Sequence, residues 1–238
     1  MKIALLGYGK MGKEIEQIAI SRNHTIVFKI DINNAADLTI ENLKKADVAI
    51  EFSTPSTAIS HIYKCFEASL PIVVGTTGWL DNLADVKKKC TEQNQALFHA
   101  SNFSIGVNIF FKVNQFLAKI MNDYPDYDVS MEEIHHIHKL DSPSGTGISL
   151  ANQVLTNINR KNKWIDGISS NNNELSIVSK REVEVPGTHT IKYTSAIDDI
   201  EIKHIAHNRK GFALGSVLAA EWIKDKKGIF GMNDLLKL

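Results

Sequence analysis

The chain has 238 residues, of which 43% are hydrophobic and 23% charged, a composition typical of a folded protein with a sizeable core. Lys plus Arg and Asp plus Glu both number 27, so the formal net charge is zero, which argues against nucleic acid or an anionic membrane as a partner. Two cysteines, Cys65 and Cys90, are too few for a disulfide framework, and the short apolar run at the N-terminus resembles neither a signal peptide nor a membrane span. We therefore expect a protein of the cytoplasm.

Short apolar runs alternate with helical patterns over roughly the first hundred residues. Strands are predicted at residues 3–6, 25–30, 46–52, 72–74 and 96–99. Between them, apolar residues recur at helical spacing, as at Met11, Ile15 and Ile18. Apolar strands of this length, separated by helices, are typical of βαβ units whose parallel sheet is buried on both faces. This part of the chain is predicted to form a Rossmann domain of the α/β class.

The pattern changes near residue 104. A helix is predicted there, with one apolar face formed by Val107, Phe110, Val113, Leu117 and Ile120. Beyond it, the sequence predicts an alternating strand at 127–132, a helix at 148–158, a polar loop at 161–173, and alternating segments at 181–185, 189–193 and 200–204. Such alternation predicts a mixed, largely antiparallel sheet in a smaller α+β domain. A last helix near 214–222 is expected to return to the first domain.

The motif G-x-G-x-x-G spans Gly7 to Gly12, after a predicted strand and at the start of a predicted helix. In a dinucleotide-binding loop, the first glycine permits a tight turn, the second lets the backbone approach a pyrophosphate, and the third lets helix and strand pack closely. The N–H groups at the start of the helix then face the phosphates. The motif alone is weak, but its position between strand and helix favours a dinucleotide site over an ordinary glycine turn.

Asp31 closes the second predicted strand about 20 residues beyond this loop, where a carboxylate accepts hydrogen bonds from the adenosine ribose. A carboxylate at this position disfavours a 2′-phosphate, so NADH is favoured over NADPH. Lys29 is close enough in sequence to tolerate the phosphate, and Asp31 could instead be a turn residue before Asn33. The cofactor is therefore predicted to be NADH, NADPH or both.

The segment 133–147 concentrates three histidines and a lysine just before a Pro-Ser-Gly turn and a predicted helix. Histidine exchanges protons near neutral pH, lysine supplies positive charge, and the N–H groups of Gly145 and Thr146 at the helix start can bind a carboxylate. These groups are suited to a small dianion that is reduced and protonated. A regular strand would place His136 on the face opposite His135, so the chain must bend there if both reach one ligand.

Two other interpretations of this segment compete. The histidines could bind zinc, but their spacing is not that of a helical H-E-x-x-H site, and we expect no metal. Alternatively, single residues such as His138 could lie on a solvated loop. That explanation suits one residue better than the whole run.

The same segment resembles a signature of the dihydrodipicolinate reductase (hydroxytetrahydrodipicolinate reductase) family, E-x-H-H-x-x-K-x-D-x-P-S-G-T, at every fixed position from Glu133 to Thr146. Further family-like stretches follow one another along nearly the whole chain, at 51–55, 74–78, 100–104, 187–190 and 230–234. Three features depart from the family pattern. The glycine loop is one residue shorter than in many members, Val183 stands where glycine is frequent, and the chain is shorter after the second helix of the smaller domain.

The resemblance implies an NAD(P)H-dependent reductase of the diaminopimelate pathway to lysine, which converts hydroxytetrahydrodipicolinate or dihydrodipicolinate to tetrahydrodipicolinate. It also implies that His135 donates a proton, that Lys139 is a second donor and stabilises charge, and that His136, Gly145 and Thr146 bind the substrate carboxylates. The residues implied for the cofactor are Gly7, Tyr8, Gly9, Lys10, Met11, Gly12, Asp31, Phe52, Gly75, Thr76, Thr77, Ala100, Ser101, Asn102 and Phe103.

The implied Rossmann domain comprises residues 1–103 and 212–238, and residues 104–211 bind the small dicarboxylate substrate and build a homotetramer. Two other functions stay open. A different Rossmann oxidoreductase, such as a sugar or semialdehyde dehydrogenase, would not need the Pro-Ser-Gly-Thr turn after the paired histidines. A nucleotide-sensing protein without enzymatic activity would keep the glycine loop but would need neither His135 nor Lys139.

Overall fold

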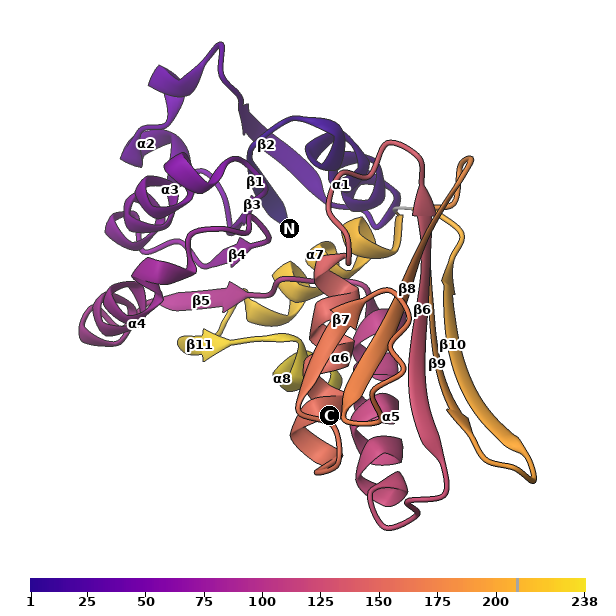
Figure 1. Ribbon diagram of the computed structural model, residues 1–238. Coiled ribbons are helices and arrows are strands. Elements are labelled where there is room, and N and C mark those ends of the chain that lie inside the picture. The colour runs from indigo at the N-terminus through magenta and orange to yellow at the C-terminus, as the bar shows by residue number, and fades with distance from the viewer. Residues whose placement is uncertain (209) are drawn as a thin grey trace. The chain divides into compact units, whose positions relative to one another are not determined.

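The computed structural model describes residues 1–208 and 210–238, which form two compact units (Figure 1). The first unit comprises Met1–Ile105 together with Lys210–Leu238, and the second begins at Gly106 and ends before Lys210. The described part of the chain contains no helix that is both long and apolar enough to cross a membrane.

A parallel sheet with strand order β11-β5-β4-β3-β1-β2 forms the centre of the first unit. Its strands are β1 (Lys2–Leu6), β2 (Thr25–Ile30), β3 (Val48–Glu51), β4 (Ile72–Val74), β5 (Ala96–His99) and β11 (Gly228–Phe230). Its helices are α1 (Lys10–Ser21), α2 (Ile40–Leu43), α3 (Pro55–Glu67), α4 (Leu83–Glu92), α7 (Lys210–Ile223) and α8 (Met232–Leu236), with short 3-10 helices at Ala35–Asp37 and Leu80–Asn82.

Both faces of this sheet are buried because successive side chains of each strand point to opposite sides. In β1, Ala4 and Leu6 pack with α2, α3 and α4, whereas Ile3 and Leu5 pack with α1, α7 and α8. Burying one such aliphatic side chain contributes roughly 1.5–3 kcal/mol. The continuous apolar runs of the sequence are therefore strands covered by helices on both sides.

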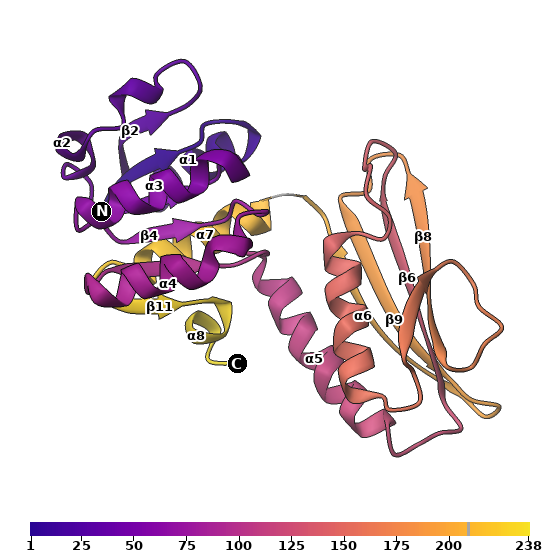
Figure 2. The ribbon, with the colours of Figure 1, turned by 60° about the vertical axis from the view of Figure 1, so that its left-hand side comes forward.

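A mixed sheet with strand order β10-β9-β6-β8-β7 forms the second unit together with two helices (Figure 2). Its strands are β6 (Asp128–His136), β7 (Lys163–Asp166), β8 (Glu174–Glu182), β9 (Gly187–Thr194) and β10 (Asp199–Ala206), and its helices are α5 (Ile105–Met121) and α6 (Gly145–Asn157). Antiparallel pairing links β10, β9 and β6, and parallel pairing links β6, β8 and β7. Both helices cover one face of the sheet. The predicted fold class, a Rossmann-type α/β unit with a second mixed sheet, is confirmed.

The prediction of which residues form the buried face of α5 is partly wrong. Val113 and Ile120 are 43% and 41% exposed, whereas Asn114 is fully buried. The Asn114 side-chain nitrogen donates hydrogen bonds to the carbonyl of Leu150 and to the side chain of Gln153, so both N–H groups of this buried amide find acceptors on α6. A count of apolar residues alone cannot find a buried face that contains such a group.

Three other segments differ from the sequence prediction. Strand β7 lies inside the segment predicted as a polar loop, because a short edge strand needs little apolar content. Residues 183–185, predicted as part of a strand, lie in a turn that follows β8, and Val183 is 73% exposed. Strand β11 and helix α8 follow the last predicted helix, and β11 extends the parallel sheet by pairing with β5.

Gly215 of α7 lies against the backbone at Phe103, so we predict that Gly215→Ala destabilises the first unit. An added Cβ would lie 1.8 Å from the Phe103 carbonyl oxygen, which cannot move without displacing the chain. The expected loss is about 1–3 kcal/mol, measured as a lower midpoint of urea unfolding. Gly211→Ala in the same helix is the control, because its Cβ would meet nothing closer than 3.6 Å and should be neutral or slightly stabilising. Equal midpoints for the two variants would contradict the prediction.

Candidate active site

The glycine loop between β1 and α1 is shaped by close backbone contacts. Gly7 has φ +102°, and a Cβ there would lie 2.1 Å from the carbonyl oxygen of Phe52. A Cβ at Gly12 would lie 2.4 Å from the carbonyl oxygen of Gly7. At Gly9, by contrast, a Cβ would meet no protein atom within 4 Å. The protein's own packing therefore requires the first and third glycines but leaves open space at the second, beside the start of α1.

Parallel strands bring most of the other predicted cofactor residues to one edge of the first sheet. Phe52, Gly75 and Ala100 directly follow the carboxyl ends of β3, β4 and β5. The Phe52 ring would lie 2.1 Å from a Cβ at Gly75, and its centroid is 5.7 Å from that of Phe103. Such edges of open parallel sheets are where α/β proteins bind ligands. The same edge carries the start of α1, with Lys10 and Met11, and the loops that carry Tyr8, Thr76, Thr77, Ser101 and Asn102.

Asp31 and Lys29 at the end of β2 have separate partners. The Asp31 carboxylate accepts a hydrogen bond from the backbone N–H of Asn33 at 2.7 Å, so the turn role considered for it is present. Lys29 Nζ lies 3.1 Å from Glu16 Oε1 and 4.4 Å from the centre of the Tyr8 ring. The bond to Glu16 raises the pKa of Lys29, and the Tyr8 hydroxyl donates to the same carboxylate. The charge of Lys29 is therefore already paired.

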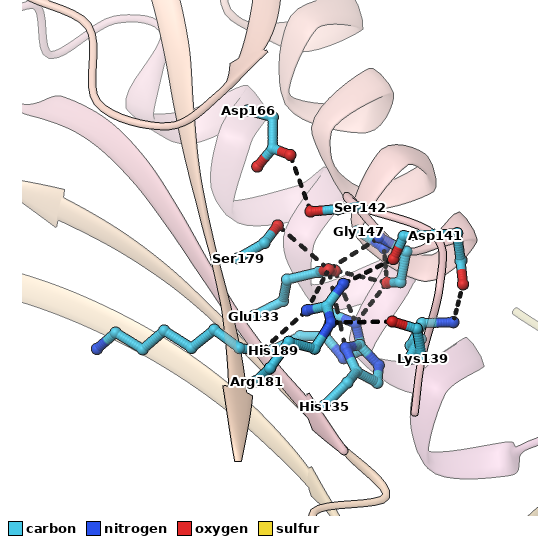
Figure 3. A network of polar contacts seen from close by, with 12 residues as sticks. Glu133, His135, Lys139, Asp141, Ser142, Gly147, Asp166, Ser179, Arg181 and His189 are labelled. Carbon is cyan, nitrogen blue, oxygen red and sulfur yellow. Dashed lines mark hydrogen bonds and ion pairs between the residues drawn. The ribbon is translucent and has the colours of Figure 1, made fainter. Parts of the chain in front are cut away.

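The predicted His–Lys segment lies at the end of β6 and in the turn after it (Figure 3). The strand ends at His136, where the Lys139 N–H donates to the His136 carbonyl at 3.0 Å, so the chain bends at the expected place. His135 is 6% exposed, and burial lowers its pKa. Lys139 Nζ forms an ion pair with Asp141 at 2.8 Å. The ring of His136 lies 6.3 Å from that of His138, which the sequence left as a candidate loop residue.

The turn after Lys139 leads into the N-terminus of α6. Ser144 caps this helix by accepting a hydrogen bond from the Gly147 N–H at 3.0 Å. A Cβ at Gly145 would meet no protein atom within 4 Å, so this first-turn glycine, like Gly9, lies beside open space. The ion pair with Lys139 lowers the pKa of Asp141. Lys139 therefore already binds one carboxylate within the chain.

Three residues near His135 have roles that the sequence analysis did not assign: Glu133, Arg181 and His189. In the sheet register Glu133 pairs with His189 of β9, and His135 pairs with Arg181 of β8. The rings of His135 and His189 are 5.1 Å apart, edge to face. Alternation along β6 predicts that Glu133 and His135 share a face, but only strand pairing brings the other two residues to them.

Glu133, His135 and His189 are also the kind of group that can bind a metal ion. One ligand atom of each lies within 4.8 Å of the others. However, both oxygens of Glu133 already accept hydrogen bonds from Ser144, one from its N–H at 2.8 Å and one from its hydroxyl at 2.5 Å. A metal ion would have to displace these bonds, so the donor set fits a hydrogen-bond network better than a metal site.

Comparison with known proteins identifies the family. The sequence matches "Dihydrodipicolinate reductase, N-terminus" over residues 1–103 and "Dihydrodipicolinate reductase, C-terminus" over residues 106–236. The chain belongs to the dihydrodipicolinate reductase family. It is 51% identical to the 4-hydroxy-tetrahydrodipicolinate reductase of Christiangramia forsetii over 239 residues, which cover 99% of this chain and 98% of that protein.

Solved structures agree with this family in fold. A dipicolinate-bound dihydrodipicolinate reductase from Paenisporosarcina sp. TG-14 has a TM-score of 0.78 with 23% identity and covers 98% of both chains. A probable dehydrogenase from Thermotoga maritima has a TM-score of 0.54 with 9% identity, and the match covers 99% of this chain and 92% of that one. The dihydrodipicolinate reductase family comprises NAD(P)H-dependent oxidoreductases of lysine and diaminopimelate biosynthesis.

The buried His189 should make this member of the dihydrodipicolinate reductase family sensitive to acid. Burial first, and then the neighbouring His135, lower the pKa of His189 from 6.5 to about 3. In the unfolded chain the His189 ring takes up a proton as the pH falls below about 6.5, but in the folded protein it stays neutral. The stability that depends on the neutral ring is therefore fully present above that pH. It should be lost as pH falls toward 3, by up to about 1.4 kcal/mol per pH unit.

Thermal unfolding at several pH values measures this effect. Between pH 7 and pH 5, the Tm of His189→Asn should fall less than that of the wild type, although its Tm at pH 7 is lower because a buried contact is lost. The exposed His138→Asn is the control and should follow the wild type. Parallel curves for the wild type and His189→Asn would show that His189 does not carry the acid sensitivity.

Proposed function

We propose that this protein catalyses the NAD(P)H-dependent reduction of hydroxytetrahydrodipicolinate or dihydrodipicolinate to tetrahydrodipicolinate, in the diaminopimelate pathway to lysine. The observation that carries the proposal is the 51% identity, over 99% of the chain, to a 4-hydroxy-tetrahydrodipicolinate reductase. We also propose that the protein is a homotetramer and that it is located in the cytoplasm. The family resemblance supports the assembly, and the composition with two cysteines supports the location.

The first unit is proposed to bind the nucleotide. The open space at Gly9 beside the start of α1 fits a pyrophosphate, because no protein atom explains a glycine there and the first-turn N–H groups attract anions. The loop that begins at Gly75 and carries Thr76 and Thr77, together with the segment from Ala100 to Phe103, is proposed for the nicotinamide side of the cofactor, with Phe52 close to the cofactor. The reduced nicotinamide, when bound, supplies the hydride.

The second unit is proposed to bind the dicarboxylate substrate. His136 and the N–H groups of Gly145 and Thr146 would hold its carboxylates, and Lys139 would offset their charge. One feature supports the role of Lys139 directly, because Lys139 already binds the carboxylate of Asp141. A substrate carboxylate offers the same chemistry as that side chain.

His135 is proposed as the proton donor. Hydride addition to a C=C–C=N system moves electron density toward the ring nitrogen and the carbon beside it, and the reduction is complete when a proton arrives. Burial lowers the pKa of His135, and additional negative charge close to the ring favours its protonated form. A dianionic substrate supplies that charge when it binds, and Lys139 limits the repulsion between its two carboxylates as negative charge develops in the ring.

The reaction is tested by NADH and NADPH oxidation with substrate generated in situ from pyruvate and aspartate semialdehyde by the partner synthase. The wild type should consume nucleotide rapidly and be inhibited by pyridine-2,6-dicarboxylate. His135→Ala and Lys139→Ala should each lower kcat by about 100- to 10,000-fold, as expected for loss of a proton donor. Near-normal turnover by Lys139→Ala would exclude its proposed role. No oxidation by the wild type, with a known reductase active in the same mixture, would exclude the reaction.

NADH is proposed as the preferred cofactor, because Asp31 directly follows β2, where Rossmann folds carry the carboxylate that binds the ribose, and because the charge of Lys29 is paired with Glu16. The kcat/KM for NADH should therefore exceed that for NADPH. Asp31→Asn keeps an acceptor for the Asn33 N–H but removes the charge, and should raise kcat/KM for NADPH about tenfold, equivalent to about 1.4 kcal/mol. Asp37→Asn removes the same charge from a neighbouring 3-10 helix and is the control. A similar rise in kcat/KM for NADPH in both variants would mean that it reflects surface charge in general and would contradict the role proposed for Asp31.

A further inference from the structure

The side chain of Glu133 is 1% exposed, and a carboxylate buried to this degree needs several partners to stay ionised. It lies on β6, two residues before His135 and on the same face of the strand. Within the described residues its two oxygens face groups from β6, β8, β9 and the start of α6, as Figure 3 shows. These contacts fall into two groups with different consequences.

The first group ties β6 to the helix start. The Ser144 N–H and hydroxyl donate to Glu133 at 2.8 and 2.5 Å, and the same hydroxyl accepts from the Gly147 N–H. A Cβ at Gly147 would lie 2.4 Å from Glu133 Oε2, so the carboxylate packs directly on the first turn of α6. The position of the Gly145 N–H relative to β6 therefore depends on this carboxylate.

The second set of Glu133 contacts surrounds His135. The Nδ1 atom of His135 is buried without a hydrogen-bond partner and lies 3.8 Å from Glu133 Oε1. Arg181 lies 3.9 Å from the same oxygen and also donates to the carbonyls of Lys139 and Asp141, at 3.4 and 2.6 Å, so it fixes the turn to β8. The Ser144 hydroxyl and His189 Nε2 are 3.2 Å apart, which fixes the ring beside His135.

We propose that Glu133 is a positioning residue with two actions: it fixes the carboxylate-binding start of α6, and it provides the negative charge that keeps a proton on His135. The inference rests on the function proposed above and adds a residue to it. Among the charged and titratable groups near His135, Lys139 and Arg181 oppose its protonation, as would a charge on His189. Only Glu133 and Asp141 favour it. Asp141 is already paired with Lys139, so the buried Glu133 is the stronger support.

The two actions can be separated by two variants. Glu133→Gln keeps the size of the side chain and removes its charge, so the alkaline limb of the kcat–pH profile should move about one pH unit lower. At pH 8 kcat should fall about tenfold, while the Ki of pyridine-2,6-dicarboxylate changes much less. Ser144→Ala keeps the charge and the Ser144 N–H bond but removes the hydroxyl that joins Glu133 to the Gly147 N–H, so Ki should rise about tenfold while the pH profile stays in place.

Matched controls come from the face of β6 opposite Glu133 and His135. Glu132→Gln removes a carboxylate that pairs with Lys180 at 2.6 Å, and Ser130→Ala removes an exposed hydroxyl. Both should match the wild type in pH profile and in Ki. Circular dichroism and Tm identify any variant that has not folded, and Glu133→Asp, which keeps the charge, should retain the wild-type pH limb if Glu133→Gln proves unstable.

A measurement without turnover separates this inference from the proposed reaction. The His135 ring can be titrated by NMR in the presence of saturating pyridine-2,6-dicarboxylate, and its pKa should be about one unit lower in Glu133→Gln than in the wild type. An unchanged pKa would overturn the proton-holding action, and an unchanged Ki in Ser144→Ala would overturn the anchoring action. Failure of the wild type to oxidise NAD(P)H would reject the reaction. The NMR titration, together with the dissociation constant of pyridine-2,6-dicarboxylate for Ser144→Ala measured by calorimetry, would still decide the role of Glu133.

Discussion

The burial of the Glu133 carboxylate is the constraint on which the second unit's site depends. An isolated carboxylate at 1% exposure would cost several kcal/mol, and it is tolerated because two donors from Ser144, with Ser179 and Arg181 nearby, satisfy its oxygens. Satisfying that one group fixes the start of α6, the turn that carries Lys139, and the ring of His189 at the same time. The geometry of the site therefore follows from the hydrogen-bond requirements of a single side chain.

The first unit follows a different constraint, the close approach of backbone to backbone in a parallel sheet. Gly7 and Gly12 are required by contacts within the protein, since a Cβ at either would overlap a carbonyl oxygen. Gly9 and Gly145 have no such requirement, and both lie in the first turn of a helix or beside it. Two glycines without a packing reason, each at a helix N-terminus, are well suited to anions that approach from outside the chain.

Electrostatics link the two halves of the proposed chemistry. Burial keeps His189 neutral and lowers the pKa of His135, so the free site holds fewer protons than its histidine content suggests. A dianionic ligand reverses that tendency at His135 because it adds negative charge close to the ring. Protonation of the proposed donor would in this way be coupled to the binding of the proposed substrate.

The sequence by itself determined strands β1 to β5 of the first unit, the glycine loop after β1, and the strand end and helix start between His135 and Thr146. Local rules suffice there, since burial on both faces produces continuous apolar runs and a helix start has recognisable capping residues. Tertiary structure alone decided the buried face of α5, where Asn114 finds partners on α6, and the edge strands β7 and β11. It also decided that Glu133 pairs with His189 and that His135 pairs with Arg181. The register of these strands is set by pairing between distant segments and leaves no local signal in the sequence.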